Sequence, residues 1–160
     1  MDPDIEALCE EHGLEPRRET VELDRRPFEV ARHHAEAKTG RDVLVIARTT
    51  DGALLIEGDR RAQLPGGTVE PGESPEWATR RRLETVGLDP RRLEPIDVVE
   101  TVHRHGGESF TTLTIVFGAV VDGDPTGSAR LVDAAPDPLA REPALSDYLE
   151  RTSALLDATD

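Results

Sequence analysis

The chain has 160 residues and a formal net charge of −14 at pH 7, with 33 Asp and Glu against 19 Lys and Arg. This length predicts one domain, and the acidic balance excludes nucleic acid as a favoured partner because a phosphate backbone requires a basic face. Lys38 is the only lysine, so arginine carries nearly all of the positive charge. An acidic, lysine-poor composition is typical of proteins from a high-salt cytoplasm. A GC-rich genome, which favours arginine codons, is the alternative explanation.

The N-terminal residues and the cysteine content predict a soluble cytoplasmic protein. The segment MDPDIEALCEEHG lacks the basic and apolar regions of a signal peptide, and no apolar run reaches membrane-spanning length. Cys9 is the only cysteine, which excludes an internal disulfide and a cysteine-based zinc cluster. We therefore expect a reducing environment and no membrane partner.

The first 40 residues predict two helices. Residues 3–12 predict a short acidic helix that ends near Gly13, and residues 27–40 have a helical composition that stops at the C-cap candidate Gly40. We expect residues 1–25 to form an N-terminal arm, either an appended helix or a partly ordered segment. Residues 26–160 are then the main domain.

Four apolar segments predict strands. Their ranges are 43–48, 53–57, 96–105 and 109–121. The Asp51-Gly52 pair between the first two suits a tight hairpin turn, and Gly106-Gly107 joins the last two.

Two further helices complete the predicted elements. Residues 75–86 predict a helix with Ser74 as its N-cap and Gly87 just beyond its end. Residues 123–130 read as a loop, and residues 142–156 place apolar side chains on one helical face. This order of elements predicts an α/β protein with helices on the faces of a mixed sheet.

The run LPGGTVEPGES, residues 64–74, leads from a predicted strand into a helix. Gly66 and Gly67 have no Cβ, so they can bring backbone groups close to a ligand, although a Gly-Gly pair alone fits a plain hairpin equally well. The whole run resembles the Nudix family, whose box reads G, five residues, E, seven residues and then R-E-U-x-E-E-x-G-U, with U aliphatic. The positions that keep this spacing are Gly67, Glu73, Arg81 and Leu83.

The resemblance covers about residues 42–121 and implies a Nudix-type α/β/α sandwich around a mixed β-sheet. It also implies a hydrolase that cleaves the diphosphate linkage of a small nucleoside diphosphate derivative, with Mg²⁺ or Mn²⁺ as cofactor. In the family, three glutamates at relative positions 0, +3 and +4 of the helix hold the metal, because that spacing stacks them on one face. A homodimer is a further hypothesis.

The helix departs from the family pattern where these glutamates should lie, because the box is one residue short. Counting forward from Gly67, the three places are held by Arg82, Thr85 and Val86. Counting backward from Gly87, they are held by Arg81, Glu84 and Thr85. We prefer the forward register because it keeps more of the family spacing. In both registers an arginine replaces the first glutamate, so the Nudix box is degenerate.

Two interpretations of the arginine run remain open. In the first, Arg80, Arg81 and Arg82 bind substrate phosphates directly in place of a metal. In the second, they form a solvated helix face in which Arg80 pairs with Glu76 and Glu84. Arg81, in its family position, is expected to brace Glu73. The candidate catalytic and metal-binding residues are Glu73 and Glu84. The candidate substrate-binding residues are Arg48, Gly66, Gly67, Arg81 and Arg82.

Several other residues are possible additions to the site. Glu100 and Glu108 either replace the lost metal ligands or are exposed strand-end carboxylates. His103 and His105 alternate with Arg104, without the spacing of a zinc motif. Trp77 could stack on a base, but on an amphipathic helix we expect it in the core.

Two functions remain open. The first is a Nudix-family hydrolase with a weakened metal site, and the second is a non-catalytic nucleotide-binding or regulatory module that keeps the fold. The resemblance to the family favours an Mg²⁺-dependent pyrophosphohydrolase, whereas the loss of at least two of three ligands favours weak or lost activity. A metal site requires Glu73, Glu84 and one of Glu70, Glu100 or Glu108 to converge.

Overall fold

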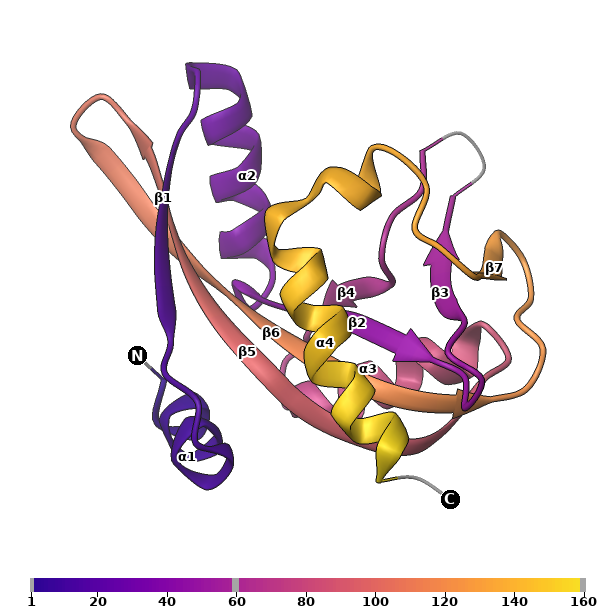
Figure 1. The fold of residues 1–160 in the computed structure, drawn as a ribbon. Helices are drawn as coiled ribbons and strands as arrows, with labels where there is room; N and C mark the ends of the chain where they lie inside the picture. Colours follow the sequence, from indigo (N-terminus) through magenta and orange to yellow (C-terminus); the bar gives the residue numbers. More distant parts are fainter. Residues whose placement is uncertain (1, 59–60, 159–160) are drawn as a thin grey trace.

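The computed structural model describes residues 2–58 and 61–158. Its elements, in chain order, are α1 (Pro3–His12), β1 (Arg17–Glu22), α2 (Arg25–Ala37), β2 (Arg41–Arg48), β3 (Leu54–Glu57), β4 (Gly66–Thr68), α3 (Pro75–Thr85), β5 (Asp89–His105), β6 (Glu108–Asp122), β7 (Ala129–Val132), the 3₁₀ helix η1 (Leu139–Arg141) and α4 (Pro143–Asp157) (Figure 1). None of the helices in these residues is long and apolar enough to cross a membrane.

A mixed seven-stranded sheet forms the centre of the molecule. Its strands follow the order β1-β5-β6-β2-β3-β7, and β4 pairs with β2 beside this path. The β5–β6 hairpin is antiparallel and forms the long curved ribbon in Figure 1, while β1 runs parallel to β5 and β2 parallel to β6. The predicted α/β class with a mixed sheet is confirmed.

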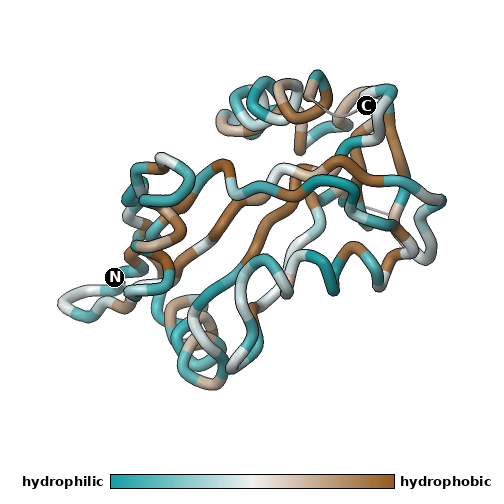
Figure 2. Tube along the Cα trace, turned by 90° about the horizontal axis from the view of Figure 1, so that it is seen from below, coloured by the Kyte–Doolittle hydropathy of each residue, from teal (hydrophilic) through white to brown (hydrophobic). Residues whose placement is uncertain are grey.

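Helices cover both faces of the sheet. Successive side chains of β2 point to opposite faces, so their packing partners show which helix lies on which face. Val43 packs with Ile5 and Ala78, so α1 and α3 cover one face. Ile46 packs with Leu145 on the opposite face, which α4 covers. Figure 2 shows the apolar strands between these helical layers. The predicted α/β/α sandwich is therefore confirmed.

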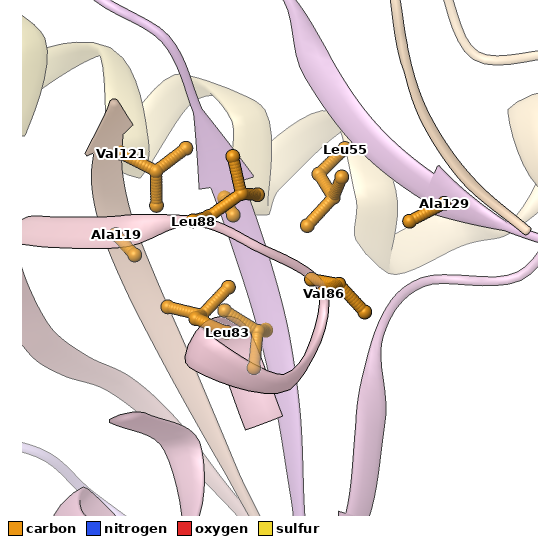
Figure 3. Packing of buried hydrophobic residues seen from close by; sticks show 9 residues of the cluster. Leu55, Leu83, Val86, Leu88, Ala119, Val121 and Ala129 are labelled. Carbon is orange, nitrogen blue, oxygen red and sulfur yellow. The ribbon is translucent and has the colours of Figure 1, made fainter. Parts of the chain in front are cut away.

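The end of α3 is anchored in a buried cluster close to β3 and β6 (Figure 3). Leu83, Val86 and Leu88 each expose 7% of their surface or less. The remaining buried members are Val45, Ala47, Leu55, Ala119, Val121 and Ala129. This packing fixes the last helical turn against the sheet.

The structure differs from the predicted elements mainly at short strands. β5 begins at Asp89 rather than at residue 96, and β1, β4 and β7 were not predicted. The prediction of a loop over residues 123–130 is wrong at its end, since Ala129 already belongs to β7. The N-terminal arm contains the predicted helix, but residues 17–22 form a strand. Every residue of β1 is exposed, so its sequence has no alternating apolar pattern to signal a strand.

A buried polar network fastens the N-terminal arm to the sheet. Asp97, only 5% exposed, accepts hydrogen bonds from Arg17 Nη2 at 2.8 Å and from the Tyr148 hydroxyl at 2.7 Å. Burial, together with the neighbouring Asp97 carboxylate, raises the pKa of Tyr148 to about 12. The network joins β1, β5 and α4, so the arm is an integral part of the sheet.

Candidate functional site

The two glycines of the loop have different surroundings. A Cβ on Gly66 would lie 2.5 Å from the Val43 carbonyl oxygen, because β4 packs closely against β2. A Cβ on Gly67 would meet nothing within 4 Å. Gly66 is therefore required by strand packing, whereas Gly67 leaves open space that a ligand can use.

The turn after the glycines is held by Glu73. Its carboxylate accepts two hydrogen bonds from Arg81, at 2.8 and 3.0 Å, and one from the Glu70 backbone N–H at 3.1 Å. Its side chain is 9% exposed, and the Arg81 guanidinium holds the pKa of Glu73 below its ordinary value. The predicted bracing of Glu73 by Arg81 is present. The next residue, Ser74, accepts from the Trp77 N–H as the predicted N-cap of α3.

Arg82 occupies a corner between α3, β3 and β4. Its Nε donates to the Gly66 carbonyl oxygen at 3.0 Å, and its Nη2 lies 2.5 Å from both carboxylate oxygens of Glu57. The side chains are 27% exposed for Arg82 and 17% for Glu57. A guanidinium therefore fills the place where the forward register puts the first metal-binding glutamate.

The other two places of the forward register also lack metal ligands. The Thr85 hydroxyl donates to the Arg81 carbonyl oxygen at 2.8 Å, and Val86 is part of the buried cluster. Glu84, the candidate ligand of the backward register, is exposed and forms no ion pair within residues 2–58 and 61–158.

The candidate replacement carboxylates are engaged elsewhere. Glu100 accepts from Arg18 at 2.6 Å, and Glu108 lies 3.5 Å from Arg32. In the part of the chain that the structure describes, no three His, Cys, Asp or Glu residues are grouped so that they could hold a metal ion. The residues present therefore do not fit the family's divalent cation.

Two of the remaining candidates are engaged in structural contacts. Arg80 bonds to Glu76 at 3.3 Å, as the solvated-face interpretation predicts, whereas a pair with Glu84 is not among the contacts of the described residues. Arg48 donates to the Gly52 carbonyl oxygen at 3.0 Å and to Ser153 Oγ at 3.1 Å. Arg48 thus joins the β2–β3 turn to α4.

The core position predicted for Trp77 is wrong, because this residue is 62% exposed. The side of α3 that faces the sheet is formed by Pro75, Ala78, Thr79 and Leu83. Trp77 projects away from that side into solvent.

Both strand histidines bind neighbouring groups rather than each other. His103 Nε2 lies 3.0 Å from Thr112 Oγ1, and its ring stacks on Phe110 with centroids 4.5 Å apart. Burial lowers the pKa of His103. His105 Nδ1 lies 3.0 Å from the Leu23 carbonyl oxygen. His103 therefore joins β5 to β6 within the hairpin, whereas His105 joins the hairpin to the segment that follows β1.

Two cavities lie on the face of the sheet that α2 and α4 cover. A cleft of about 520 Å³, the α4 cleft, lies between α4, η1 and the sheet. Its lining includes Arg17, Leu44, Arg61, Leu64, Ala144 and Tyr148. A second cavity of about 690 Å³, the α2 groove, is lined by residues that include Val30, Ala35, His103 and Phe110.

A smaller basic pocket of about 190 Å³ lies beside the glycine loop. Lys38, Arg81 and Arg82 line it together with Gly67 and Glu70. Sequence reasoning did not select Lys38 or Glu57, because each lies far along the chain from α3 and has no motif of its own. The only signal that Lys38 offered was that it is the single lysine.

Comparison with known proteins agrees with this architecture. The NUDIX domain family matches residues 37–135, whereas no curated protein matches the chain. A solved structure of MutT, from Aliivibrio salmonicida or Vibrio cholerae, superposes with a TM-score of 0.50 at 22% identity, covering 69% of this chain and 95% of that one. A protein from Chromobacterium violaceum, described as a nudix hydrolase family member, gives 0.48 at 19% identity, covering 72% and 77%.

At these identities the likeness to solved structures concerns the fold alone. The match to the family model covers the candidate site itself, because residues 37–135 include the glycine loop, the Glu73–Arg81 pair and all of α3. Before it lie α1, β1 and most of α2, and after it lie η1 and α4. Since the match spans more than half of the chain, the protein belongs to the Nudix family.

Proposed function

We propose that this protein binds a nucleoside diphosphate derivative without hydrolysing it by the metal-dependent route of its family. The observation that carries the proposal is the contact of Arg82 with Glu57 and the Gly66 carbonyl oxygen. A guanidinium fixed at this place repels a divalent cation and already neutralises the carboxylate beside it.

The α4 cleft is the proposed position of the organic part of the ligand. Its volume of about 520 Å³ lies within the range of about 300–1,000 Å³ common for small-molecule sites. Leu44, Val116 and Leu145 provide apolar surface for a base or sugar. The cleft wall at residues 61–64 continues through Pro65 into the glycine loop.

Arginine in and beside the cleft supplies the charge for phosphate recognition. Arg17 lines the cleft, and its Nε and Nη2 are fixed by Asp97 and Tyr148. Arg61 lines the same cavity. A guanidinium that is already held in place loses little conformational entropy when a phosphate binds. Glu19 and Glu142 line the same cleft, so directed hydrogen bonds from the guanidinium groups, rather than a net positive charge, would recognise a phosphate.

Titration calorimetry in the presence of EDTA tests this proposal. The ligands are ADP, ATP, ADP-ribose, a nucleotide sugar and a dinucleoside polyphosphate. We expect one of them to bind wild-type protein, and Ala144→Trp, which fills the α4 cleft, to weaken binding at least about tenfold, a loss of about 1.4 kcal/mol.

The matched control is Ala35→Trp, which places the same bulk on a helix alanine of the α2 groove. It should leave the affinity unchanged. No binding by any ligand in EDTA would overturn the proposal. Loss of binding in Ala35→Trp but not in Ala144→Trp would reject the α4 cleft as the site.

A second candidate is a hydrolase with a weakened Mg²⁺ or Mn²⁺ site. The retained spacing of Gly67, Glu73 and Arg81 favours it, as does Glu84, a solvent-exposed carboxylate on α3. Cleavage of a diphosphate linkage into two phosphate monoesters that depends on Mg²⁺ and disappears in Glu84→Gln would select this candidate over the binding module.

A further inference from the structure

The strand β1 forms one edge of the sheet. It lies at one end of the strand order, pairs with β5, and all six of its residues are exposed. Figure 1 shows it as an extended segment between α1 and α2. An edge strand presents N–H and C=O groups that can pair with another chain, and proteins commonly prevent this with charged residues. The charges of β1 therefore decide whether this edge repels a second chain or selects one.

The backbone groups of β1 alternate in direction, and a hydrogen bond at its end shows which residues face outward. The Leu23 N–H donates to the Arg104 carbonyl oxygen of β5 at 2.8 Å. Successive residues of a strand direct their backbone groups to opposite sides. Counting back from Leu23, the residues that point their N–H and C=O groups away from β5 are Arg18, Thr20 and Glu22.

The outward-facing groups of two copies can pair with each other in a symmetric register. In an antiparallel pair, residues directly opposite each other either both point towards the partner strand or both point away from it. A register with Thr20 opposite Thr20 of the second copy meets this condition. It also places Arg18 opposite Glu22 of the second copy, once on each side of the two-fold axis. Cross-strand ion pairs and Thr–Thr pairs both stabilise antiparallel strands.

The alternative alignments of the two strands are less favourable. Sliding one strand by two residues in one direction places Glu19 opposite Glu19 of the second copy, and like charges directly opposite destabilise the pair. Sliding it by two residues in the other direction shortens the paired region of β1 to residues 20–22. Sliding it by one residue sets outward-facing groups against inward-facing ones, which breaks the hydrogen-bond ladder. The sequence of β1 therefore favours one register.

We propose that the protein forms a homodimer in which the β1 strands of two copies pair antiparallel, with Thr20 on the two-fold axis. The two sheets then continue into each other. The same register places Val21, an apolar side chain that is 37% exposed, opposite Glu19 of the second copy, and so covers part of it. One pair of short strands is a small interface compared with the about 1,200–2,000 Å² of stable complexes, so we expect a weak dimer.

Sedimentation equilibrium of the full chain at about 10–500 µM tests the dimer, because weak interfaces associate in this range. A buffer with about 0.5 M NaCl limits the repulsion between two copies of net charge −14 to a few ångströms. We expect the average mass to rise from that of a monomer towards that of a dimer. Wild-type protein that stays monomeric up to the highest concentration would overturn the proposal.

Two charge reversals distinguish the proposed register from other modes of association. Arg18→Glu and Glu22→Arg each place like charges opposite each other on both sides of the axis, so each variant alone should self-associate at least about tenfold more weakly than wild type. Mixing the two variants restores opposite charges at both positions. The mixture, followed by sedimentation with one variant fluorescently labelled, should therefore associate at least about tenfold more tightly than either variant alone. A mixture that gains no affinity contradicts the register.

Arg80→Glu and Glu84→Arg are the matched controls, because they make the same two charge changes on α3. Each should dimerise as the wild-type protein does, and mixing them should add no affinity. If this pair gains as much on mixing as the β1 pair, net charge rather than the β1 register drives association, and the proposal is wrong.

Thr20→Pro tests the backbone pairing without changing any charge. The Thr20 N–H points to the open edge, so proline removes a hydrogen bond of the dimer but none to β5, and edge strands tolerate proline at such positions. We expect a monomer whose Tm lies within about 3 °C of the wild-type value. Persistence of the dimer in this variant would exclude pairing through β1.

Arg18→Glu also removes a hydrogen bond to Glu100, so its folding is checked by circular dichroism. If it does not fold, Glu22→Arg and Thr20→Pro decide the question. Both should be monomeric where the wild-type protein is a dimer, and wild-type association of either one would overturn the proposal. The dimer does not depend on the proposed function, because Arg18, Thr20 and Glu22 lie outside the lining of the α4 cleft. Failure of one test therefore leaves the other unaffected.

Discussion

The glycine loop and the end of α3 are consecutive parts of one motif, yet they differ in what they retain. The loop keeps the spacing of Gly67, Glu73 and Arg81, and its Glu73–Arg81 ion pair is formed. At the end of α3, Arg82 bonds to Glu57 and Val86 is buried in the core. The first part maintains the turn into α3, whereas the second no longer presents metal ligands.

This difference shows that the contacts that maintain the fold can be separated from those that would bind a metal. Glu73 and Arg81 neutralise each other and hold the loop, independent of any ion. Arg82 joins α3 to β3 through Glu57 and to β4 through the Gly66 carbonyl oxygen. The Nudix fold is thus complete in this protein without a group of metal-binding carboxylates among the described residues.

The largest expected effect of a single substitution at the end of α3 is that of Arg82→Ala. It leaves Glu57 and the Gly66 carbonyl unpaired, so the free energy of unfolding should fall by about 3 kcal/mol. Arg80→Ala, which removes an exposed i,i+4 pair, should change it by less than about 0.5 kcal/mol. Chemical denaturation of both variants checks this prediction. Equal effects would mean that the contacts of Arg82 with Glu57 and the Gly66 carbonyl oxygen add no stability beyond that of an exposed ion pair.

The next largest effect distinguishes the two loop glycines. Gly66→Ala places a Cβ against the Val43 carbonyl oxygen and should lower the free energy of unfolding by about 2 kcal/mol. Gly67→Ala, where the space is open, should change it by less than about 0.5 kcal/mol while weakening binding of a ligand that reaches the loop. Denaturation and calorimetry on the two variants measure these effects. A strongly destabilised Gly67→Ala would contradict the described geometry.

A smaller effect, with a defined pH dependence, is expected at Glu73. Glu73→Gln weakens the pair with Arg81 and should cost about 1 kcal/mol at neutral pH. Because Arg81 lowers the pKa of Glu73 in the folded protein, this stabilisation is complete above the ordinary carboxyl pKa of about 4.3 and is lost as the pH falls through the lowered value. Denaturation from pH 7 to pH 3 should show the two proteins converging at acidic pH. The exposed Glu76→Gln serves as control.

The smallest expected effect is that of Glu84→Gln. Its side chain is exposed and forms no ion pair in the described ranges, so stability should change by less than about 0.5 kcal/mol. The response to Mg²⁺ should also stay the same. If this substitution removes a Mg²⁺-dependent stabilisation, α3 binds metal through Glu84, and the backward register of the box is correct.

The sequence predicted the fold well because the relevant signals were local. The Asp51-Gly52 turn, the Ser74 N-cap and the apolar face of the last helix each lie within a few residues, and all three are present. The strand β1 was missed because its partner is β5, far along the chain, and its six residues are all exposed. β4 was missed because three residues containing two glycines resemble a turn.

The candidate site was less predictable than the fold. The spacing of Glu73 and Arg81 indicated their ion pair correctly. The partner of Arg82 could not be predicted, because Glu57 lies 25 residues away in an ordinary apolar strand. Gly66 was expected to approach a ligand, but the structure shows its close approach to β2. Contacts between distant segments decide these roles, and a single sequence carries no direct signal of them.

We propose above that this protein keeps the Nudix fold but lacks metal-dependent hydrolase activity. ³¹P NMR of the wild-type protein with the same panel of diphosphate compounds, first in EDTA and then with excess Mg²⁺, tests it most directly. We predict that a bound ligand shifts its resonances in EDTA and that no cleavage products appear after Mg²⁺ is added. Mg²⁺-dependent cleavage of a diphosphate linkage by the wild-type protein would contradict the claim.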